Sequence, residues 1–194
     1  MRQQSEIVLV DDDEGVRNAL SFALRAAGYR VLAYGGAAPF LADEPHLEPG
    51  FVVTDVRMPG LSGLDLLNRL RETNRPWQVA VMSGHGDIPM AVEAMRSGAC
   101  EFIEKPFQPD ELVDRLGRLI ESRVTPAVGA RLPKLTSRET EVLTHVVGGQ
   151  TTKAIARDLG ISPRTVEVHR AAIMQKTGSR SLSDLIRMAL QAGL

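Results

Sequence analysis

Short apolar runs alternate with amphipathic stretches through the first two thirds of the chain. The apolar runs lie near residues 6–10, 30–34, 51–54, 79–82 and 100–103, and each has the length of a buried strand. Between and after them, apolar residues recur at helical spacing near 16–27, 37–43, 64–72, 90–98 and 111–122. This alternation predicts a five-stranded parallel sheet with helices on both faces.

The periodic pattern is broken in the segment 121–135, where Pro126, Gly129 and Pro133 interrupt it. Beyond this segment only helical patterns occur. We therefore predict a first domain over residues 1–122, a linker over 123–135 and a small all-α domain of four helices over 136–194.

Two of the helix starts in the second domain carry recognisable signals. Thr136 is followed three residues later by Glu139, which is the spacing of a capping box. A second helix is expected over about 151–159. Ser162 followed by Pro163 predicts the start of a third, with Ser as the cap and Pro at the first helical position. The fourth is expected over about 181–191.

Charge divides the 194-residue chain in the same place. The net charge is −1, but residues 1–122 hold 12 Lys and Arg against 19 Asp and Glu, or −7, while residues 123–194 hold 11 against 5, or +6. The basic half is a candidate for binding a polyanion such as DNA. No apolar run is long enough to span a membrane, and a single cysteine forms no disulfide within the chain, so we expect a cytoplasmic protein.

Polar residues follow four of the predicted strands. Because the carboxyl ends of strands in an open parallel sheet meet at one edge, where ligands bind, these residues are expected to converge. They are Asp11, Asp12 and Asp13 after the first strand, Asp55 after the third, Ser83, Gly84 and His85 after the fourth, and Lys105 and Pro106 after the fifth.

Acids brought together in one cleft need a cation. Two carboxylates about 4 Å apart repel by roughly 4 kcal/mol at an effective dielectric constant near 20. Mg²⁺ suits such a site because it takes one or two carboxylates together with waters and a phosphate. Lys105 and Ser83 could bind a phosphate oxygen, and Asp55 could act as a carboxylate nucleophile that forms an aspartyl phosphate. Taken singly, the acids also fit solvated turns or a helix cap.

The segments VDDDEGVR, TDVRMPGLSG, MSGHGD and EFIEKPF resemble the signature segments of two-component receiver domains, over about residues 5–122. The resemblance implies a flavodoxin-like, doubly wound α/β fold with strand order 2-1-3-4-5 and a cis Lys105-Pro106 peptide. It also implies site roles: phosphoacceptor Asp55; Mg²⁺ ligands Asp12, Asp55 and the carbonyl of Arg57; acidic-pocket residue Asp11; and phosphate-binding and switch residues Ser83, Phe102 and Lys105.

The second domain contains a helix–turn–helix pattern, TTKAIARDLG followed by a turn at 160–162 and PRTVEVHRAAIMQK. In this motif the second helix enters the major groove of DNA. The alternative is a helical packing domain with a solvated basic face. His169 has no Cys or second His at ligand spacing, so we do not expect a metal site there.

LTSRETEVL, KAIARDLGIS and RTVEVHRAAIMQK resemble the LuxR-type four-helix DNA-binding domain, over about residues 132–194. Thr152 stands where that family more often has Asn, which affects a hydrogen bond at the helix start. The resemblance implies base contacts from Glu167, Val168 and Ala171 and phosphate contacts from Thr165, His169, Lys153 and Lys176, with Arg164 and Arg170 also at the interface.

Together the two resemblances imply a response regulator that acts as a transcription factor, not as an enzyme on a separate substrate. The segment GHGDIPMAVEAMRSGACEFIEKPF most closely resembles the FixJ-like subgroup of these regulators. The implied partners are a sensor histidine kinase, double-stranded DNA, a second copy of the chain after phosphorylation, and RNA polymerase as a further contact, with no membrane. The alternatives are a phosphorylation-independent DNA-binding regulator with a vestigial receiver, and a Mg²⁺-dependent phosphatase with an aspartyl intermediate.

Overall fold

The computed structural model describes residues 6–84, 88–122 and 132–194. Within them, residues 6–84 and 97–122 belong to one compact unit, and residues 88–96 and 132–194 to a second. The predicted linker lies largely outside the described residues, as does His85, so the predicted domain boundaries remain predictions.

A five-stranded parallel sheet forms the centre of the first unit. Its order is β2-β1-β3-β4-β5, as the sequence resemblance implies. The strands rise to one carboxyl edge, because β3 is paired on one side with β1, Val10 opposite Thr54, and on the other with β4, Asp55 opposite Met82. Their bounds are β1 Glu6–Val10, β2 Arg30–Tyr34, β3 Phe51–Asp55, β4 Gln78–Ser83 and β5 Glu101–Glu104.

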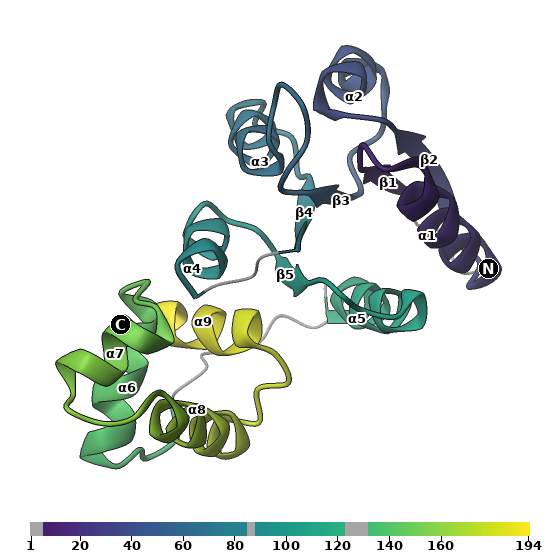
Figure 1. Ribbon diagram of the computed structural model, residues 1–194. Coiled ribbons are helices and arrows are strands. Elements are labelled where there is room, and N and C mark those ends of the chain that lie inside the picture. The colour runs from purple at the N-terminus through teal and green to yellow at the C-terminus, as the bar shows by residue number, and fades with distance from the viewer. Residues whose placement is uncertain (1–5, 85–87, 123–131) are drawn as a thin grey trace. The chain divides into compact units, whose positions relative to one another are not determined.

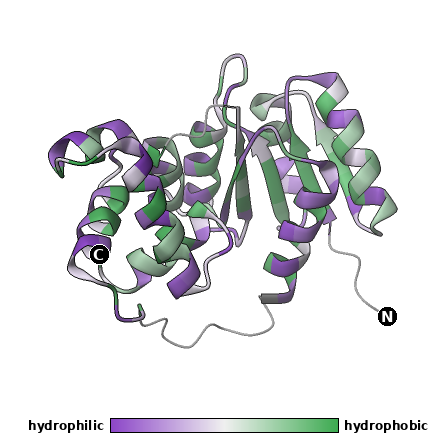
Figure 2. Cartoon of the chain, turned by 60° about the horizontal axis from the view of Figure 1, so that its bottom comes forward, coloured by the Kyte–Doolittle hydropathy of each residue, from purple (hydrophilic) through white to green (hydrophobic). Residues whose placement is uncertain are grey.

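Helices cover both faces of this sheet. Figure 1 shows α1 and α5 on one face and α2 and α3 on the other. The middle parts of the strands are green in Figure 2, since parallel strands that are buried on both faces are largely apolar. The bounds are α1 Glu14–Ala26, α2 Ala37–Asp43, the short 3-10 helix η1 Glu44–His46, α3 Gly63–Glu72 and α5 Pro109–Ser122. Helix α4, Ile88–Arg96, belongs to the second unit.

The main core lies between the sheet and the pair α1 and α5. Leu20 and Leu24 of α1 and Leu112 and Leu116 of α5 pack there against the strands, and all four are at most 4% exposed.

Four helices of the second unit match the four that the sequence predicts. They are α6 Ser137–Val147, α7 Thr152–Asp158, α8 Pro163–Thr177 and α9 Leu182–Gln191. The predicted capping box is present: the Thr136 side chain accepts from the Glu139 amide, and Glu139 accepts from the Thr136 amide. Helix α8 ends at Gly178 in the left-handed region with φ 70°, a conformation that favours glycine.

Val166 and Ile173 of α8 are fully buried in this unit, together with Val142 and Leu143 of α6 and Leu185 and Ile186 of α9. Burying one stripe of α8 leaves the opposite stripe exposed. None of the described helices combines the length and the apolar character that a bilayer crossing requires.

Candidate functional site

Asp55 is the last residue of β3 and is 7% exposed. The chain continues past it in register, since the amide of Val56 donates to the carbonyl of Met82 at 2.8 Å. Gly63 then begins α3 against this strand end: a Cβ at Gly63 would lie 2.2 Å from the carbonyl oxygen of Asp55. Backbone on both sides therefore fixes the position of the acid.

Lys105 bridges two acids from different strands. Its Nζ lies 2.6 Å from Oδ1 of Asp55 and 2.9 Å from Oδ2 of Asp11. Burial lowers the pKa of Lys105, but the hydrogen bonds that the ammonium donates to the carboxylates of Asp55 and Asp11 outweigh this effect, and the pKa lies above its ordinary value. The lysine is therefore a charged, fixed counter-ion. Its backbone amide donates to the carbonyl of Ser83 at 2.8 Å, which extends the pairing of β4 with β5.

The three consecutive acids after β1 have different surroundings. Asp11 is 1% exposed and accepts from the Asp13 amide at 2.9 Å. Asp13 caps α1 by accepting from the Val16 amide at 3.0 Å, and hydrogen bonds from backbone amides lower its pKa. Asp12 is exposed. Asp13 therefore belongs to the cap of α1.

The expectation that three acids converge on one cation differs from the structure. Across residues 6–84, 88–122 and 132–194, no group of three or more His, Cys, Asp or Glu side chains is placed to hold a metal ion. The reason is local. Asp13 turns to the start of α1, Asp12 faces solvent, and the remaining pair, Asp11 and Asp55, shares the Lys105 ammonium.

Asp55 uses both of its oxygens. Oδ1 takes the lysine, and Oδ2 accepts from the Arg57 amide at 2.6 Å. The peptide between Lys105 and Pro106 is cis, as the family resemblance implies.

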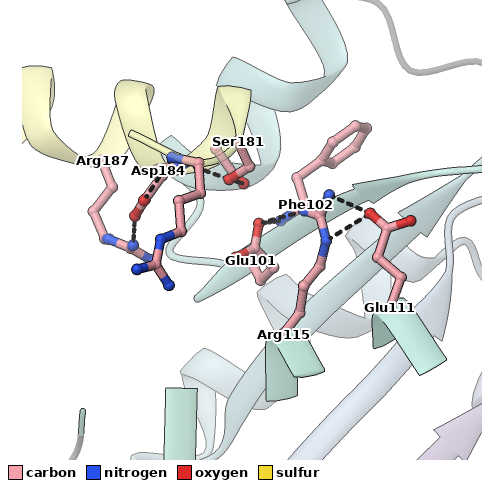
Figure 3. A network of polar contacts seen from close by, with 9 residues as sticks. Glu101, Phe102, Glu111, Arg115, Ser181, Asp184 and Arg187 are labelled. Atoms are coloured by element: carbon pink, nitrogen blue, oxygen red, sulfur yellow. Dashed lines mark hydrogen bonds and ion pairs between the residues drawn. The ribbon is translucent and has the colours of Figure 1, made fainter. Parts of the chain in front are cut away.

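Ser83 and Phe102, the two predicted switch residues, lie on neighbouring strands. Ser83 is 1% and Phe102 6% exposed. The amide of Phe102 donates to the side chain of Glu101 at 3.2 Å, and Arg115 of α5 lies 3.5 Å from the same carboxylate (Figure 3). Arg115 also bonds Glu111 at 2.7 Å. Figure 3 also shows a helix cap of the second unit, where the amide of Asp184 donates to Ser181 and Arg187 pairs with Asp184.

The second site is the helix–turn–helix of α7 and α8. Ser162 caps α8 by accepting from the Thr165 amide at 3.1 Å, and the two hydroxyls of Ser162 and Thr165 lie 2.8 Å apart. Gly160 takes a left-handed φ of 65° in the turn. The predicted start of α8 at Ser162 and Pro163 is confirmed.

The predicted DNA-contacting residues differ in exposure. Lys153, Arg164, Glu167 and Ala171 are exposed, and Val168 is 61% exposed although it is apolar. Thr165 and His169 are half-buried. The exposed stripe of α8 can therefore meet base edges, and Lys153 of α7 can meet a phosphate.

Lys176 and Arg170, two of the predicted DNA-contacting residues, also have partners inside the unit. Lys176 lies 2.7 Å from Glu139, and this hydrogen bond, together with the one from the Thr136 amide, lowers the pKa of Glu139 to about 2. Arg170 pairs with Glu167 at 2.9 Å. Thr152 also donates to Glu167, at 2.9 Å, while the helix start is capped by its neighbour Thr151.

Several residues and contacts of the two sites were not predicted from the sequence. The capping-box spacing identified Glu139 as a helix-start residue, yet its pairing with Lys176 joins residues 37 apart and has no local signal. Arg17 donates to the carbonyl of Asp11 at 2.8 Å, and Gly63 lets α3 approach Asp55. The glycine directly after the Ser62 cap was the signal that could have revealed the close approach.

Each of the two parts of the chain matches a known protein family. Residues 7–117 match the response regulator receiver domain, and residues 133–189 match the bacterial regulatory proteins of the luxR family. The receiver match includes α4. The chain belongs to the response regulators that join a receiver domain to a LuxR-type DNA-binding domain.

More narrowly, it is FixJ-like. It is 42% identical over 206 residues to the transcriptional regulatory protein FixJ of Bradyrhizobium diazoefficiens, covering 100% of this chain and 98% of that protein. It is 46% identical over 193 residues to FixJ of Rhizobium meliloti, covering 95% of each. The crystal structure of full-length FixJ from B. japonicum is similar, with a TM-score of 0.58 and 42% identity over 98% of each chain. The protein is a transcription regulator of a two-component system.

Proposed function

We propose that Asp55 accepts a phosphoryl group from a phosphohistidine of a partner histidine kinase. The observation that carries this proposal is the Lys105 ammonium fixed between Asp55 and Asp11 at the carboxyl edge of the sheet. In the transfer, a carboxylate oxygen of Asp55 forms the new O–P bond and the P–N bond breaks, with its electron pair staying on the imidazole nitrogen. After the transfer, the Lys105 ammonium would pair with an oxygen of the phosphoryl group.

Mg²⁺ fits this site as a cofactor of the transfer. Two buried carboxylates within reach of one ammonium leave a net negative charge, and Mg²⁺ needs only one or two carboxylates besides water and phosphate. Asp12, Asp55 and the carbonyl of Arg57 are the proposed ligands. The exposure of Asp12 suits a metal that keeps several waters. When bound, the ion would neutralise charge on the transferring group.

Ser83 and Phe102 are the proposed switch. A phosphoryl group on Asp55 carries about two negative charges, in place of the one on the carboxylate, together with strong acceptor oxygens, so the Ser83 hydroxyl is drawn toward it. Ser83 and Asp55 end neighbouring strands, since Ser83 directly follows the Met82 that pairs with Asp55. Phe102 would then turn into the space that Ser83 leaves, and the packing around β5 would change with it.

The output we propose is DNA binding by α8 in the major groove, controlled by dimerisation of the phosphorylated chain. The exposed stripe of Glu167, Val168 and Ala171 supports base contact, and Lys153 supports phosphate contact. A dimer would bind two half-sites about one helical turn, roughly 34 Å, apart. We place this activity in the cytoplasm, with RNA polymerase as a further partner.

Phosphoryl incorporation from a small phosphodonor tests the acceptor directly. Asp55→Asn should abolish incorporation, while Asp114→Asn, the same change at an exposed acid of α5, should leave it at the wild-type level. Incorporation by Asp55→Asn at the wild-type rate would overturn the assignment. An unphosphorylatable wild type that still binds DNA would favour the vestigial-receiver alternative.

A further inference from the structure

The Glu167 carboxylate of α8 is held by partners from two helices. The hydroxyl of Thr152, the first residue of α7, donates to Oε1 at 2.9 Å. Nη1 of Arg170, one turn further along α8, donates to Oε1 at 2.9 Å and to Oε2 at 3.0 Å. One contact within α8 and one between the helices therefore fix the direction of this side chain.

Arg170 differs from an ordinary surface partner. Its side chain is only 17% exposed, whereas that of Glu167 is 53% exposed. Its Nε is buried and, among the described residues, has no hydrogen-bond partner. Exposed i,i+3 pairs are weak because both long side chains must be ordered to meet. Here packing has already ordered the Arg170 side chain, so forming the pair costs less entropy and restricts the orientation of the Glu167 side chain.

The hydrogen bonds already made show which oxygen of the Glu167 carboxylate can still accept a donor from outside the protein. A carboxylate offers about four lone-pair sites. Oε1 receives two donors and Oε2 receives one, so Oε2 keeps the more open capacity. Because the side chain is half exposed, Oε2 can accept one more donor from outside the protein. In the major groove the amino group of cytosine is such a donor, and adenine offers its amino group beside an acceptor that repels a carboxylate.

We infer that Thr152 and Arg170 are positioning residues that aim Oε2 of Glu167 at a cytosine amino group, so that Thr152 sets base preference without touching a base. The inference rests on the proposed docking of α8 in the major groove. Thr152 is free for this role because Thr151 caps α7, its hydroxyl accepting from the Ala154 amide at 3.2 Å.

The test is a binding selection with the full chain. The protein, saturated with Mg²⁺ and beryllofluoride, is used to select sequences from a randomised double-stranded DNA pool. For the wild type we expect one position of each half-site to favour cytosine. Thr152→Val removes the hydroxyl at nearly constant shape and should lower that preference about five- to tenfold. Affinity for unselected DNA should change by less than about twofold, because phosphate contacts are untouched.

Three matched variants make the outcome specific. Thr152→Ser keeps the hydroxyl and should restore the preference. Glu167→Ala should lose the preference altogether. Thr151→Val removes the cap of α7 and should lower the melting temperature while leaving the preference unchanged.

Two results would overturn the inference about Thr152 while leaving base reading by Glu167 intact. In both, Glu167→Ala loses the cytosine preference. In one, Thr152→Val keeps the cytosine preference. In the other, it weakens binding to all sequences equally and Thr152→Ser fails to rescue it. If Glu167→Ala keeps the preference, base reading by Glu167 fails and the inference fails with it. Phosphoryl incorporation at Asp55 is measured without DNA, so its failure is recognised separately.

Discussion

The ammonium nitrogen of Lys105 lies 2.6 Å from the carboxylate of Asp55, although 50 residues separate the two in sequence. The same nitrogen lies 2.9 Å from Asp11. One cation thus faces two anions before any phosphate arrives. Phosphorylation would replace the single charge of the Asp55 carboxylate by about two charges on the phosphoryl group, which together with Asp11 one ammonium does not balance. The site therefore has a net negative charge that favours binding of a second cation, and phosphorylation increases that charge.

Replacing Lys105 by Met should destabilise the first unit. Asp11 and Asp55 would face each other without their counter-ion, and breaking a largely buried pair of this kind costs about 2 kcal/mol after allowance for the partial exposure of the lysine. Urea unfolding at neutral pH in the presence of a chelator measures this loss. Added Mg²⁺ should restore more stability to the variant than to the wild type, because the ion replaces the missing charge.

Lys153→Met is the control for that experiment. It removes the same charge from an exposed position of α7 and should leave both the stability and its Mg²⁺ dependence unchanged. Equal stability of Lys105→Met and wild type in chelator would contradict the account of Lys105 as a fixed counter-ion.

Gly63→Ala should shift the position of Asp55 without changing any charge. The new Cβ would meet the Asp55 carbonyl oxygen at 2.2 Å and its carbon at 2.9 Å, so β3 or α3 must move. We expect a lower urea midpoint and slower phosphoryl incorporation. Gly117→Ala in α5 is the matched control, because its Cβ meets no atom closer than the Tyr29 hydroxyl at 3.5 Å and alanine favours the helix. Unimpaired incorporation by Gly63→Ala would show that the close approach is not needed.

The Glu139–Lys176 pair should make the second unit sensitive to acid. The folded-state pKa of Glu139, about 2, lies below its ordinary 4.5, so its stabilising contribution is present above pH 4.5 and is lost as the pH falls toward 2. Carbon-13 NMR of the Glu139 carboxyl in the full chain should find it ionised well below pH 4.5. In Lys176→Met the titration should move up toward the ordinary value.

Lys134→Met, which removes an exposed lysine before α6, should leave the Glu139 titration in place. A Glu139 carboxyl that titrates near 4.5 in the wild-type protein would mean that Lys176 is not its partner in solution and is available for DNA phosphate.

Lys153→Ala should weaken DNA binding uniformly across sequences. A lysine that contacts one phosphate contributes about one unit to the slope of log affinity against log salt, so the slope should shrink by about 1. Fluorescence anisotropy over a salt series measures it. Lys134→Ala should leave the slope as it is. A sequence-dependent loss in Lys153→Ala would instead assign this residue to base reading.

The sequence was sufficient for elements and caps because their signals are local. Strand β3 and the capping box of Thr136 and Glu139 lie where apolar runs and spacing placed them. The meeting of Asp55 with Lys105 was also predictable, since parallel strands end at a common edge.

Contacts that depend on how helices cross were not predictable. Lys176 reads as a phosphate-binding residue at the end of a basic helix, and only the packing of α6 against α8 gives it Glu139. Thr152 reads as a helix-start residue, and only the angle of α7 to α8 brings it to Glu167. Asp12 and Asp13 carry the same carboxyl group, yet backbone direction after β1 sends one to solvent and one to a cap.

The central claim is that phosphorylation of Asp55 controls DNA binding, and one paired measurement tests it most directly. DNA affinity and sedimentation are measured with and without Mg²⁺ plus a phosphodonor, for the wild type and for Asp55→Asn. The account predicts that dimer fraction and affinity rise together in the wild type and that neither rises in Asp55→Asn. Equally tight DNA binding in both states of the wild-type protein would contradict it.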